Sequence, residues 1–193
     1  GRRLYGLDYD SLTNNVNPLL ITHSNLSVAL ANISIGRNNE AREIIGNLED
    51  KRYNQDEGLF DSQDCRNDDY DKKFFVDDQA LAILVYERLS ETHKAENLAK
   101  SVLNSPLYDS KSGLFNRSFS RRGTDTTKST YKNGLIAQAF GKLGYSEELK
   151  GIQEGLIREL YDPNERLFNH SSRDKTKIPD NSALALVALE YRV

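Results

Sequence analysis

Residues Tyr53-Asn-Gln-Asp-Glu-Gly-Leu-Phe60 form a stretch that recurs twice more in this chain. The other copies are Tyr108-Asp-Ser-Lys-Ser-Gly-Leu-Phe115 and Tyr161-Asp-Pro-Asn-Glu-Arg-Leu-Phe168, so the final Phe residues stand 55 and 53 positions apart. Self-similarity at such a period marks a protein built from repeated units. The Asp, Asn and Gly residues between Tyr and Leu-Phe predict a tight turn that ends in a short extended piece.

An apolar segment rich in Ala and Gly follows each copy of this Tyr–x6–Phe motif, and a similar segment precedes the first. The segments begin near Asn25, Gln79, Asn133 and Ser182. They are apolar on most faces, and small residues allow helices to approach closely. These features predict buried inner helices.

A polar break and then an amphipathic segment follow each of the first three inner helices. The apolar residues of these segments are spaced as one stripe of a helix, and the other faces are charged, as in outer helices. The expected stripes are Ala41, Ile44, Ile45 and Leu48; Ala95, Leu98, Ala99, Val102 and Leu103; and Leu149, Ile152, Leu156, Ile157 and Leu160.

The pattern predicts an all-α fold of inner and outer helical hairpins, with strands limited to the Tyr–x6–Phe pieces. We expect one domain over residues 1–193, with repeats at approximately 20–71, 72–127 and 128–179 and a partial repeat at 180–193. Short turns join the two helices of a hairpin, whereas long polar loops lead from each Phe to the next inner helix. The long loops gather at one end, where function is expected.

Composition excludes several classes of function. The net charge is −3 and Lys and Arg are scattered, so no nucleic-acid partner is expected. No apolar run approaches the ~18 residues of a membrane span. A single cysteine excludes a thiolate metal cage, and the absence of P-loop, GxGxxG and GxSxG motifs predicts no cofactor and no serine hydrolase. The cellular compartment is left open.

Hairpins of this period, joined by an aromatic D-x-x-x-G-L-F turn, resemble the (α/α) toroid superfamily, which includes six-hairpin glycosidases and N-acylglucosamine 2-epimerase-like proteins. The resemblance covers essentially the whole chain but rests on architecture and one turn motif. It implies a partial toroid or a short solenoid, because a six-hairpin ring needs roughly twice as many helices. The chain opens inside a unit already under way, contains no Met, and closes without an outer partner for its last inner helix. We therefore expect a fragment of a longer protein, or an additional chain or domain that completes the ring.

The resemblance also implies where the site lies. In that superfamily the active site is at the funnel mouth, lined by the starts of the inner helices and the loops before them. By position, the substrate-binding candidates in this chain are His23, Arg117, Tyr131, Lys132, His170 and Asn181.

Catalytic carboxylates are usual at such a mouth, and Asp77 and Asp78 are the best candidates. A glycosidase needs two carboxyl groups about 5 to 9.5 Å apart, on either side of the scissile bond. Asp77 or Asp78 would supply one, and Asp69 or Asp180 the other. The alternative is structural: Asp77 as a helix N-cap and Asp78 as a first-turn acid favoured by the helix dipole.

No metal site is predicted. The acidic segment Asp61–Asp71 lacks the Gly and Glu spacing of an EF-hand and is interpreted as a solvated loop. His23 and His170 belong to no HxH or HExxH pattern. They are candidates for proton transfer, with a neutral hydrogen-bonding role as the alternative.

Two functions remain open from the sequence. The first is a carbohydrate-active domain, glycoside hydrolase-like or epimerase-like, that acts at the loop-rich end. The second is a non-catalytic helical-repeat module that binds a peptide, glycan or protein partner on its concave surface. The absence of Trp counts against a sugar site. An enzyme needs a closed pocket with a carboxylate pair, whereas a binding module shows an open groove.

Overall fold

The computed structural model describes residues 8–10, 15–17, 22–62, 72–178 and 185. Six α-helices within these residues form three hairpins. The first hairpin is α1 (Thr22–Ser34) and α2 (Asn38–Arg52), the second is α3 (Val76–Arg88) and α4 (Thr92–Asn104), and the third is α5 (Thr130–Leu143) and α6 (Ser146–Leu160). The alternation of inner and outer helices is therefore confirmed for three units. The fourth inner helix, expected near Ser182, lies outside the described residues apart from Ala185.

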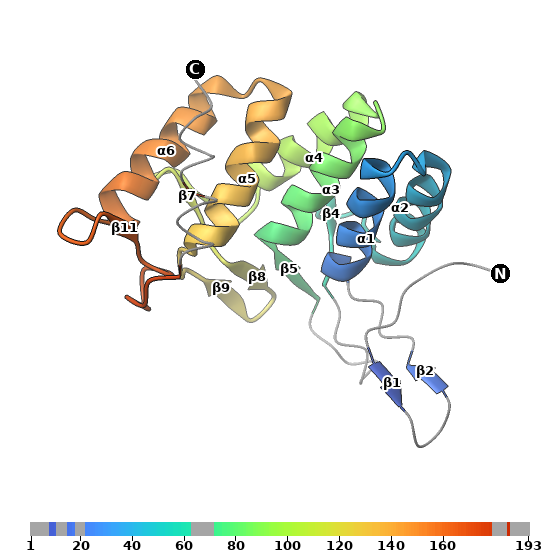
Figure 1. Ribbon diagram of the computed structural model, residues 1–193, viewed down its shortest axis with the longest axis horizontal. Helices are drawn as coiled ribbons and strands as arrows, with labels where there is room; N and C mark the ends of the chain where they lie inside the picture. Colours follow the sequence, from blue (N-terminus) through green and yellow to red (C-terminus); the bar gives the residue numbers. More distant parts are fainter. Residues whose placement is uncertain (1–7, 11–14, 18–21, 63–71, 179–184, 186–193) are drawn as a thin grey trace.

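The helices form two layers (Figure 1). Inner helix α3 packs between α1 and α5, and each outer helix packs on the inner helix of its own hairpin. Every residue of α3 from Val76 to Tyr86 is buried, as expected for an inner helix that is enclosed on all sides. Helix α1 is less enclosed, with Thr22, Asn25, Leu26 and Ala29 as its buried residues.

The outer helices bury the expected apolar stripes, with two departures. Leu103 is only partly buried, and Ile157 is 51% exposed. Leu103 in α4 and Ile157 in α6 occupy equivalent positions, because each lies eleven residues after the first residue of its helix. Ile157 therefore lies at the edge of its stripe, where no described helix covers it.

Each Tyr–x6–Phe stretch is a two-stranded hairpin, which contains the expected tight turn and the expected extended Leu-Phe piece. The pairs are β3 (Tyr53–Asn54) with β4 (Leu59–Phe60), β6 (Tyr108–Asp109) with β7 (Leu114–Phe115), and β10 (Tyr161–Asp162) with β11 (Leu167–Phe168). Tyr and Phe are register partners in all three, and their ring centroids are 5.0–5.2 Å apart. The residue before Leu has a positive φ in each turn: Gly58, Gly113 and Arg166.

The expectation of an all-α fold holds only roughly, because the described residues contain more strands than these turns. A three-stranded sheet joins β5 (Lys73–Phe75), β8 (Ser118–Ser120) and β9 (Gly123–Asp125), and a hairpin joins β1 (Asp8–Asp10) to β2 (Asn15–Asn17). The rings of Phe74 and Phe119 stack across β5 and β8 with centroids 4.8 Å apart. This apolar pair between two long loops stabilises a sheet where only loop was expected.

The inner helices begin three residues earlier than predicted, at Thr22, Val76 and Thr130. The polar residues expected to open two of them are instead buried in the fourth position. Gln79 accepts a hydrogen bond from the Phe60 N–H (2.9 Å) and donates to its carbonyl (2.7 Å). Asn133 does the same with Phe115, at 2.7 and 3.1 Å. These amides join each inner helix to the preceding turn.

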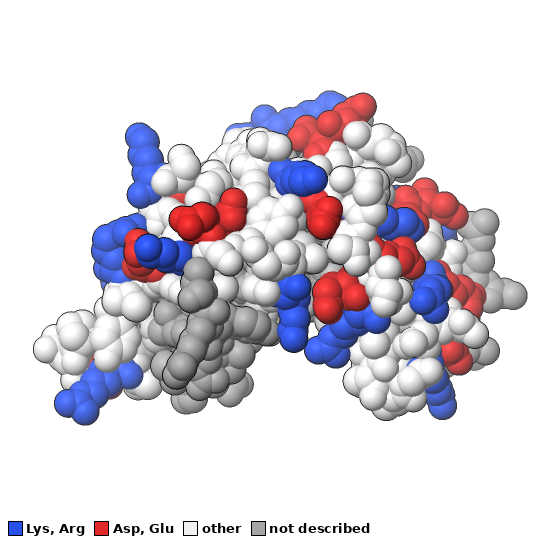
Figure 2. Space-filling model, turned by 90° about the horizontal axis from the view of Figure 1, so that it is seen from above, with Lys and Arg blue, Asp and Glu red and all other residues white. Residues whose placement is uncertain are grey.

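The β1–β2 hairpin and the β5–β8–β9 sheet lie at the lower end of Figure 1, and the short inner-to-outer turns lie at the upper end. Seen from above, the short-turn end carries acidic and basic side chains interspersed with one another (Figure 2). No helix among the described residues has the length and hydropathy needed to cross a membrane. We call the loop-rich lower end the mouth.

Candidate functional site

The first turns of three successive inner helices meet at the mouth. Their second and third residues differ from unit to unit: His23 and Ser24 in α1, Asp77 and Asp78 in α3, and Tyr131 and Lys132 in α5. Their neighbours are more alike, since the fourth position is Asn25, Gln79 or Asn133. The repeat therefore provides a common frame that displays unlike side chains next to one another.

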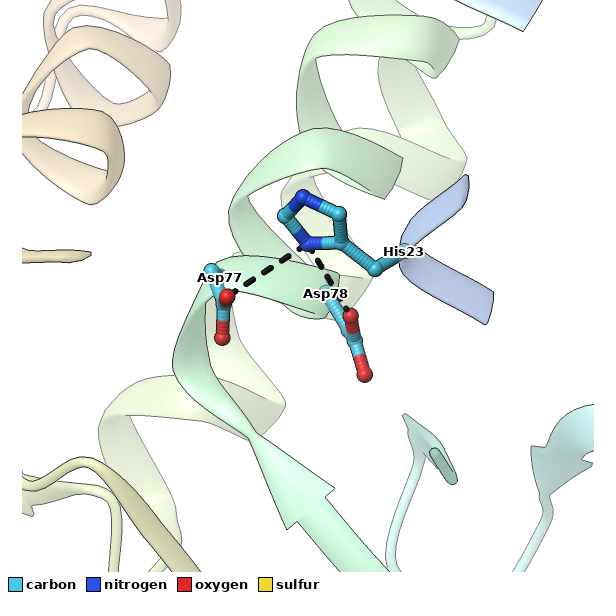
Figure 3. A group of neighbouring side chains, drawn as sticks. All are labelled: His23, Asp77 and Asp78. Atoms are coloured by element: carbon cyan, nitrogen blue, oxygen red, sulfur yellow. Dashed lines mark ion pairs between the residues drawn. The ribbon is translucent and has the colours of Figure 1, made fainter. Parts of the chain in front are cut away.

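Four of these side chains form one group of contacts, which we call the mouth cluster: His23, Asp77, Asp78 and Lys132. The imidazole Nδ1 of His23 lies 3.4 Å from Asp77 Oδ2 and 3.5 Å from Asp78 Oδ1. Figure 3 shows the imidazole, which comes from α1, facing both carboxylates at the start of α3. From the other side, Lys132 Nζ donates to Asp77 Oδ1. The cluster thus links α1, α3 and α5.

The members differ in how far solvent reaches them. The side chain of His23 is 36% exposed, whereas the side chains of Asp77 and Lys132 are 11% and 14% exposed. The side chain of Asp78 is only 2% exposed. Of the four side chains, His23 is therefore the most accessible to a molecule at the mouth, and Asp78 is the least accessible.

The charges in the cluster shift one another's pKa values. Hydrogen bonding to Asp77 and then to Asp78 raises the pKa of His23 to about 9, against the opposing effect of burial. Burial acts to raise the pKa of Asp77. The contacts with His23 and Lys132 outweigh burial, and the resulting pKa lies below the usual range. Burial raises the pKa of Asp78, and the hydrogen bond to His23 offsets this increase only in part. The cluster therefore holds two neighbouring carboxyl groups with pKa values displaced in opposite directions.

One buried oxygen of the cluster has no hydrogen-bond partner within the described residues. Asp78 Oδ1 faces His23, but Asp78 Oδ2 is enclosed without a donor. A buried carboxylate oxygen without a donor is costly unless the group is neutral or a cation lies close by. The cluster is also the group of His, Cys, Asp and Glu in the described residues whose donor atoms are near enough to hold a metal ion, through His23, Asp77 and Asp78.

Two aromatic residues border the cluster. Lys132 Nζ lies 4.9 Å from the centroid of the half-buried Phe75 ring, which also receives Lys73 at 4.9 Å. Both contacts are within the range of cation–π attraction. Burial raises the pKa of Tyr131, and the nearby charge of Asp77 raises it further. Phe75 was not among the sequence candidates, although an aromatic residue directly before an inner helix is a usable signal.

The structure brings only part of the predicted site together. His23, Asp77, Asp78 and Lys132 meet, with Tyr131 beside them. Arg117 points to the β8–β9 hairpin, where its Nη1 lies 3.9 Å from Asp125 Oδ2. His170 lies near the start of α5, where its carbonyl accepts from the Thr130 N–H (3.1 Å). Asp69, Asp180 and Asn181 lie outside the described residues.

The proposed N-cap role of Asp77 is wrong, whereas Asp78 does lie in the first turn of α3 as expected. The N-cap residue is Phe75, with no side-chain cap, and both acids lie inside the first turn. Their carboxylates face neighbouring helices because His23 and Lys132 provide stronger partners than the local backbone. Asp77 and Asp78 also sit on one helix and face one imidazole, so together they do not flank a bond from opposite sides as a glycosidase pair does.

A separate cavity of about 230 Å³ lies on the outer side of the fold. It shares no residue with the mouth cluster. It is lined by Glu49, Tyr53, Gln55, Tyr86, Lys94, Asn97 and Leu98. Tyr86 and Lys94 both bond Glu49 there at 2.6 Å, so its polar groups are already paired with one another.

No protein-family model and no curated protein sequence matches this chain. Solved structures match it in fold. A sugar epimerase from a ruminal bacterium has a TM-score of 0.72 at 12% identity, over 97% of this chain and 58% of that one. The GH76 α-mannanase of Bacteroides thetaiotaomicron has a TM-score of 0.69 at 12% identity, over 86% and 50%. The protein geranylgeranyltransferase-I of Candida albicans has a TM-score of 0.60 at 13% identity, over 95% and 52%.

Identities this low show a shared fold and nothing about substrate, and the third structure differs from the others in the chemistry that its name gives. The chain spans about half the length of the structures that it matches. Its three hairpins, with inner helices in one layer and outer helices in another, therefore have the (α/α) toroid fold in partial form.

Proposed function

We propose that this chain is a carbohydrate-active domain whose chemistry takes place at the mouth cluster. The observation that carries the proposal is the meeting of His23, Asp77 and Lys132 from three successive inner helices. A positive centre beside buried carboxylates suits reactions that build negative charge on a sugar oxygen. The toroid structures named for sugar epimerase and α-mannanase activity add support from the fold.

Each member of the cluster has a distinct proposed role. His23 is the most exposed member, and it contacts the substrate and polarises one of its oxygens. Asp78, at 2% exposure, is a positioning residue that acts through His23. Lys132 holds Asp77 in place, and the ionised Asp77 carboxylate accepts the C2 proton of the open-chain sugar while His23 donates a proton to the C1 oxygen. Return of a proton to C2 and loss of the proton on the oxygen then complete the exchange. Tyr131 and Phe75 border the opening and would contact the sugar ring.

The geometry favours epimerase-like proton transfer over two-carboxylate hydrolysis. Hydrolysis needs a second acid across the substrate, and Asp77 and Asp78 share one helix and one imidazole. Asp69 and Asp180 remain proposed partners for a hydrolytic reaction, and they lie outside the described residues. The two reactions give different products, which separates them experimentally.

The test incubates the purified chain with mannose, glucose, N-acetylglucosamine and cellobiose in D₂O, and with mannan in water. Proton NMR follows loss of the C2 proton signal, and a reducing-end assay follows hydrolysis. We expect C2 exchange with at least one sugar and a loss of about 100-fold or more in His23→Gln. The matched control is His93→Gln, an exposed histidine at the start of α4, which should keep full activity.

A non-catalytic binding module is the second candidate, and one observation favours it. The two carboxylates of the cluster are matched by His23 and Lys132, so the group can simply link three inner helices. On that account a sugar or peptide binds without turnover, and His23→Gln lowers stability instead of activity. Sugar binding with no C2 exchange and no new reducing ends would support the non-catalytic binding module over the enzyme. Absence of both binding and turnover would overturn the carbohydrate proposal.

A further inference from the structure

We propose that His23, Asp77 and Asp78 form a binding site for a divalent transition-metal cation of the zinc type. The inference rests on the geometry of the mouth cluster and holds whether or not the substrate is a carbohydrate. It assigns a ligand to a cluster in which the sequence predicted no metal site.

The spacing of the donor atoms supports the site. Charge-assisted hydrogen bonds between nitrogen and carboxylate oxygen are usually about 2.7–2.9 Å long. The His23 Nδ1 distances of 3.4 and 3.5 Å to Asp77 Oδ2 and Asp78 Oδ1 are clearly longer. Two ligands about 2.0–2.2 Å from a tetrahedral zinc ion lie roughly 3.3–3.6 Å apart. The three donor atoms all lie within 4.8 Å of one another, so a single ion can reach each of them.

The buried carboxylate of Asp78 provides an independent reason for a cation. Its side chain is 2% exposed, and its Oδ2 has no hydrogen-bond partner among the described residues. Enclosing a carboxylate with one oxygen left without a donor is costly, and a cation bound at the other oxygen offsets part of that cost by balancing the charge of the group. Figure 3 shows the Asp78 carboxylate beside His23 with one oxygen facing the ring, as a ligand oxygen would lie.

The residue next to the donor set behaves as an outer partner of a metal ligand. Lys132 Nζ bonds Asp77 Oδ1 and leaves Asp77 Oδ2 turned toward His23. Carboxylates that bind metals are commonly held by such a second hydrogen bond, which fixes their orientation. Two carboxylates and one divalent ion sum to zero charge, and Lys132 brings the sum to +1, so its positive charge opposes the cation only modestly.

The donor types indicate which cation fits. An imidazole nitrogen with two carboxylate oxygens suits zinc and similar transition metals, whereas calcium and magnesium prefer oxygen alone. Three protein ligands leave the fourth tetrahedral position open, as in catalytic zinc sites. A bound ion would replace the proton of His23 as the positive charge that polarises a substrate oxygen.

The test is direct titration of the chelator-treated chain with Zn²⁺ by calorimetry, with Ca²⁺ and Mg²⁺ in parallel. We expect one zinc ion per chain and no comparable heat from calcium or magnesium. His23→Gln should weaken zinc binding more than tenfold, because loss of an outer partner alone typically costs roughly 10- to 100-fold. Asp78→Asn should do the same, while His93→Gln, a surface histidine on α4, should bind as the unmodified chain does.

Circular dichroism of the metal-free variants shows whether each one is folded. Asp78→Asn alters a fully buried group, so its zinc titration counts only if the variant is folded. His23→Gln alters a partly exposed group, so this variant tests the site even if Asp78→Asn does not fold. No zinc binding by the unmodified chain would overturn the inference. Equal weakening in His93→Gln and His23→Gln would also overturn it, because the ion would then be adventitious. Zinc binding without sugar turnover would support the metal site and contradict the proposed function. Sugar turnover without zinc binding would support the proposed function and contradict the metal site.

Discussion

The side-chain amide of Asn133 is hydrogen-bonded to both backbone groups of Phe115, 18 residues earlier in the chain. It accepts from the Phe115 N–H at 2.7 Å and donates to the Phe115 carbonyl at 3.1 Å. Both residues are fully buried, so water cannot replace these bonds. Gln79 makes the same pair with Phe60. The inner helices are therefore joined to the preceding turns by specific polar contacts within an apolar core.

Replacing Asn133 by Ala should lower the free energy of unfolding by about 2–3 kcal/mol, because two buried backbone groups lose their partner. Urea unfolding followed by circular dichroism measures the change. Asn97→Ala on the exposed face of α4 is the matched control, and it should change stability by less than about 0.5 kcal/mol. An equal effect of the two substitutions would show that the Asn133 bonds contribute little.

The turn glycines carry a second prediction. Gly113 has a φ of +69°, and a Cβ atom there would lie 2.5 Å from the Gly151 carbonyl of α6. Gly113→Ala should therefore destabilise the chain by about 2–4 kcal/mol, through backbone strain and overpacking together. Gly46→Ala in α2, where nothing lies within 4 Å, should instead stabilise it by about 0.5–1 kcal/mol. Thermal denaturation of the two variants distinguishes these opposite signs.

The third turn explains why the glycine is not required everywhere. Arg166 occupies the place of Gly113 with a φ of +55°. Leu167, which follows it, is 37% exposed, whereas Leu59 and Leu114 in the earlier turns are fully buried. Because no described outer helix covers this turn, a full side chain fits there. Arg166→Gly should accordingly change stability by less than about 1 kcal/mol, measured in the same denaturation series.

A pH dependence follows from the turn of the second unit. The hydrogen bond from Lys128, with help from Ser112, holds the pKa of Asp109 at about 2. Since the folded-state pKa lies below the unfolded value of about 3.9, the stabilisation is present above pH 4 and is lost as the pH falls toward 2. Asp109 is about one-third exposed, so solvent screening reduces the contribution to about 1 kcal/mol.

Urea unfolding at pH 4.5 and pH 2 measures this loss. Asp109→Asn should remove about 1 kcal/mol of the difference in stability between the two pH values, because the substituted side chain does not titrate. Asp56→Asn in the exposed turn of the first unit is the control and should leave the difference unchanged. An unaltered pH dependence in Asp109→Asn would contradict the assignment of the shift to Lys128.

Much of the fold was predictable from the sequence because the repeat depends on residues that contact one another within a short stretch of chain. Tyr, Leu and Phe recur at fixed spacing in all three turns, with Gly before Leu in the first two, and each acts within its own turn. The β5–β8–β9 sheet was not predictable, because it depends on Phe74 meeting Phe119 across 45 residues. The starts of the inner helices were misplaced for a related reason. Gln79 and Asn133 resemble helix-opening polar residues, yet their partners are the turns of the preceding unit.

Four of the residues predicted for the site, His23, Asp77, Asp78 and Lys132, meet in the structure, but their contacts could not be predicted from the sequence. His23, Asp78 and Lys132 stood out because they differ at positions where the units otherwise agree. The ion pair between Lys132 and Asp77 joins residues 55 positions apart, and it depends on how α3 and α5 pack. Capping was therefore the natural local interpretation of Asp77. It failed because two long-range partners compete with the helix backbone for its carboxylate.

The titration of His23 provides the last prediction. In the metal-free protein, hydrogen bonds to Asp77 and Asp78 raise its pKa to about 9. A raised folded-state pKa means that these contacts stabilise the fold fully below about pH 6.5 and lose that effect as the pH rises toward 9. NMR titration of the imidazole signals in the presence of a chelator measures the value. Asp77→Asn should shift the midpoint back toward 6.5, because it removes the largest cause. A midpoint near 6.5 in the unmodified chain would mean that the imidazole does not face the two carboxylates in solution.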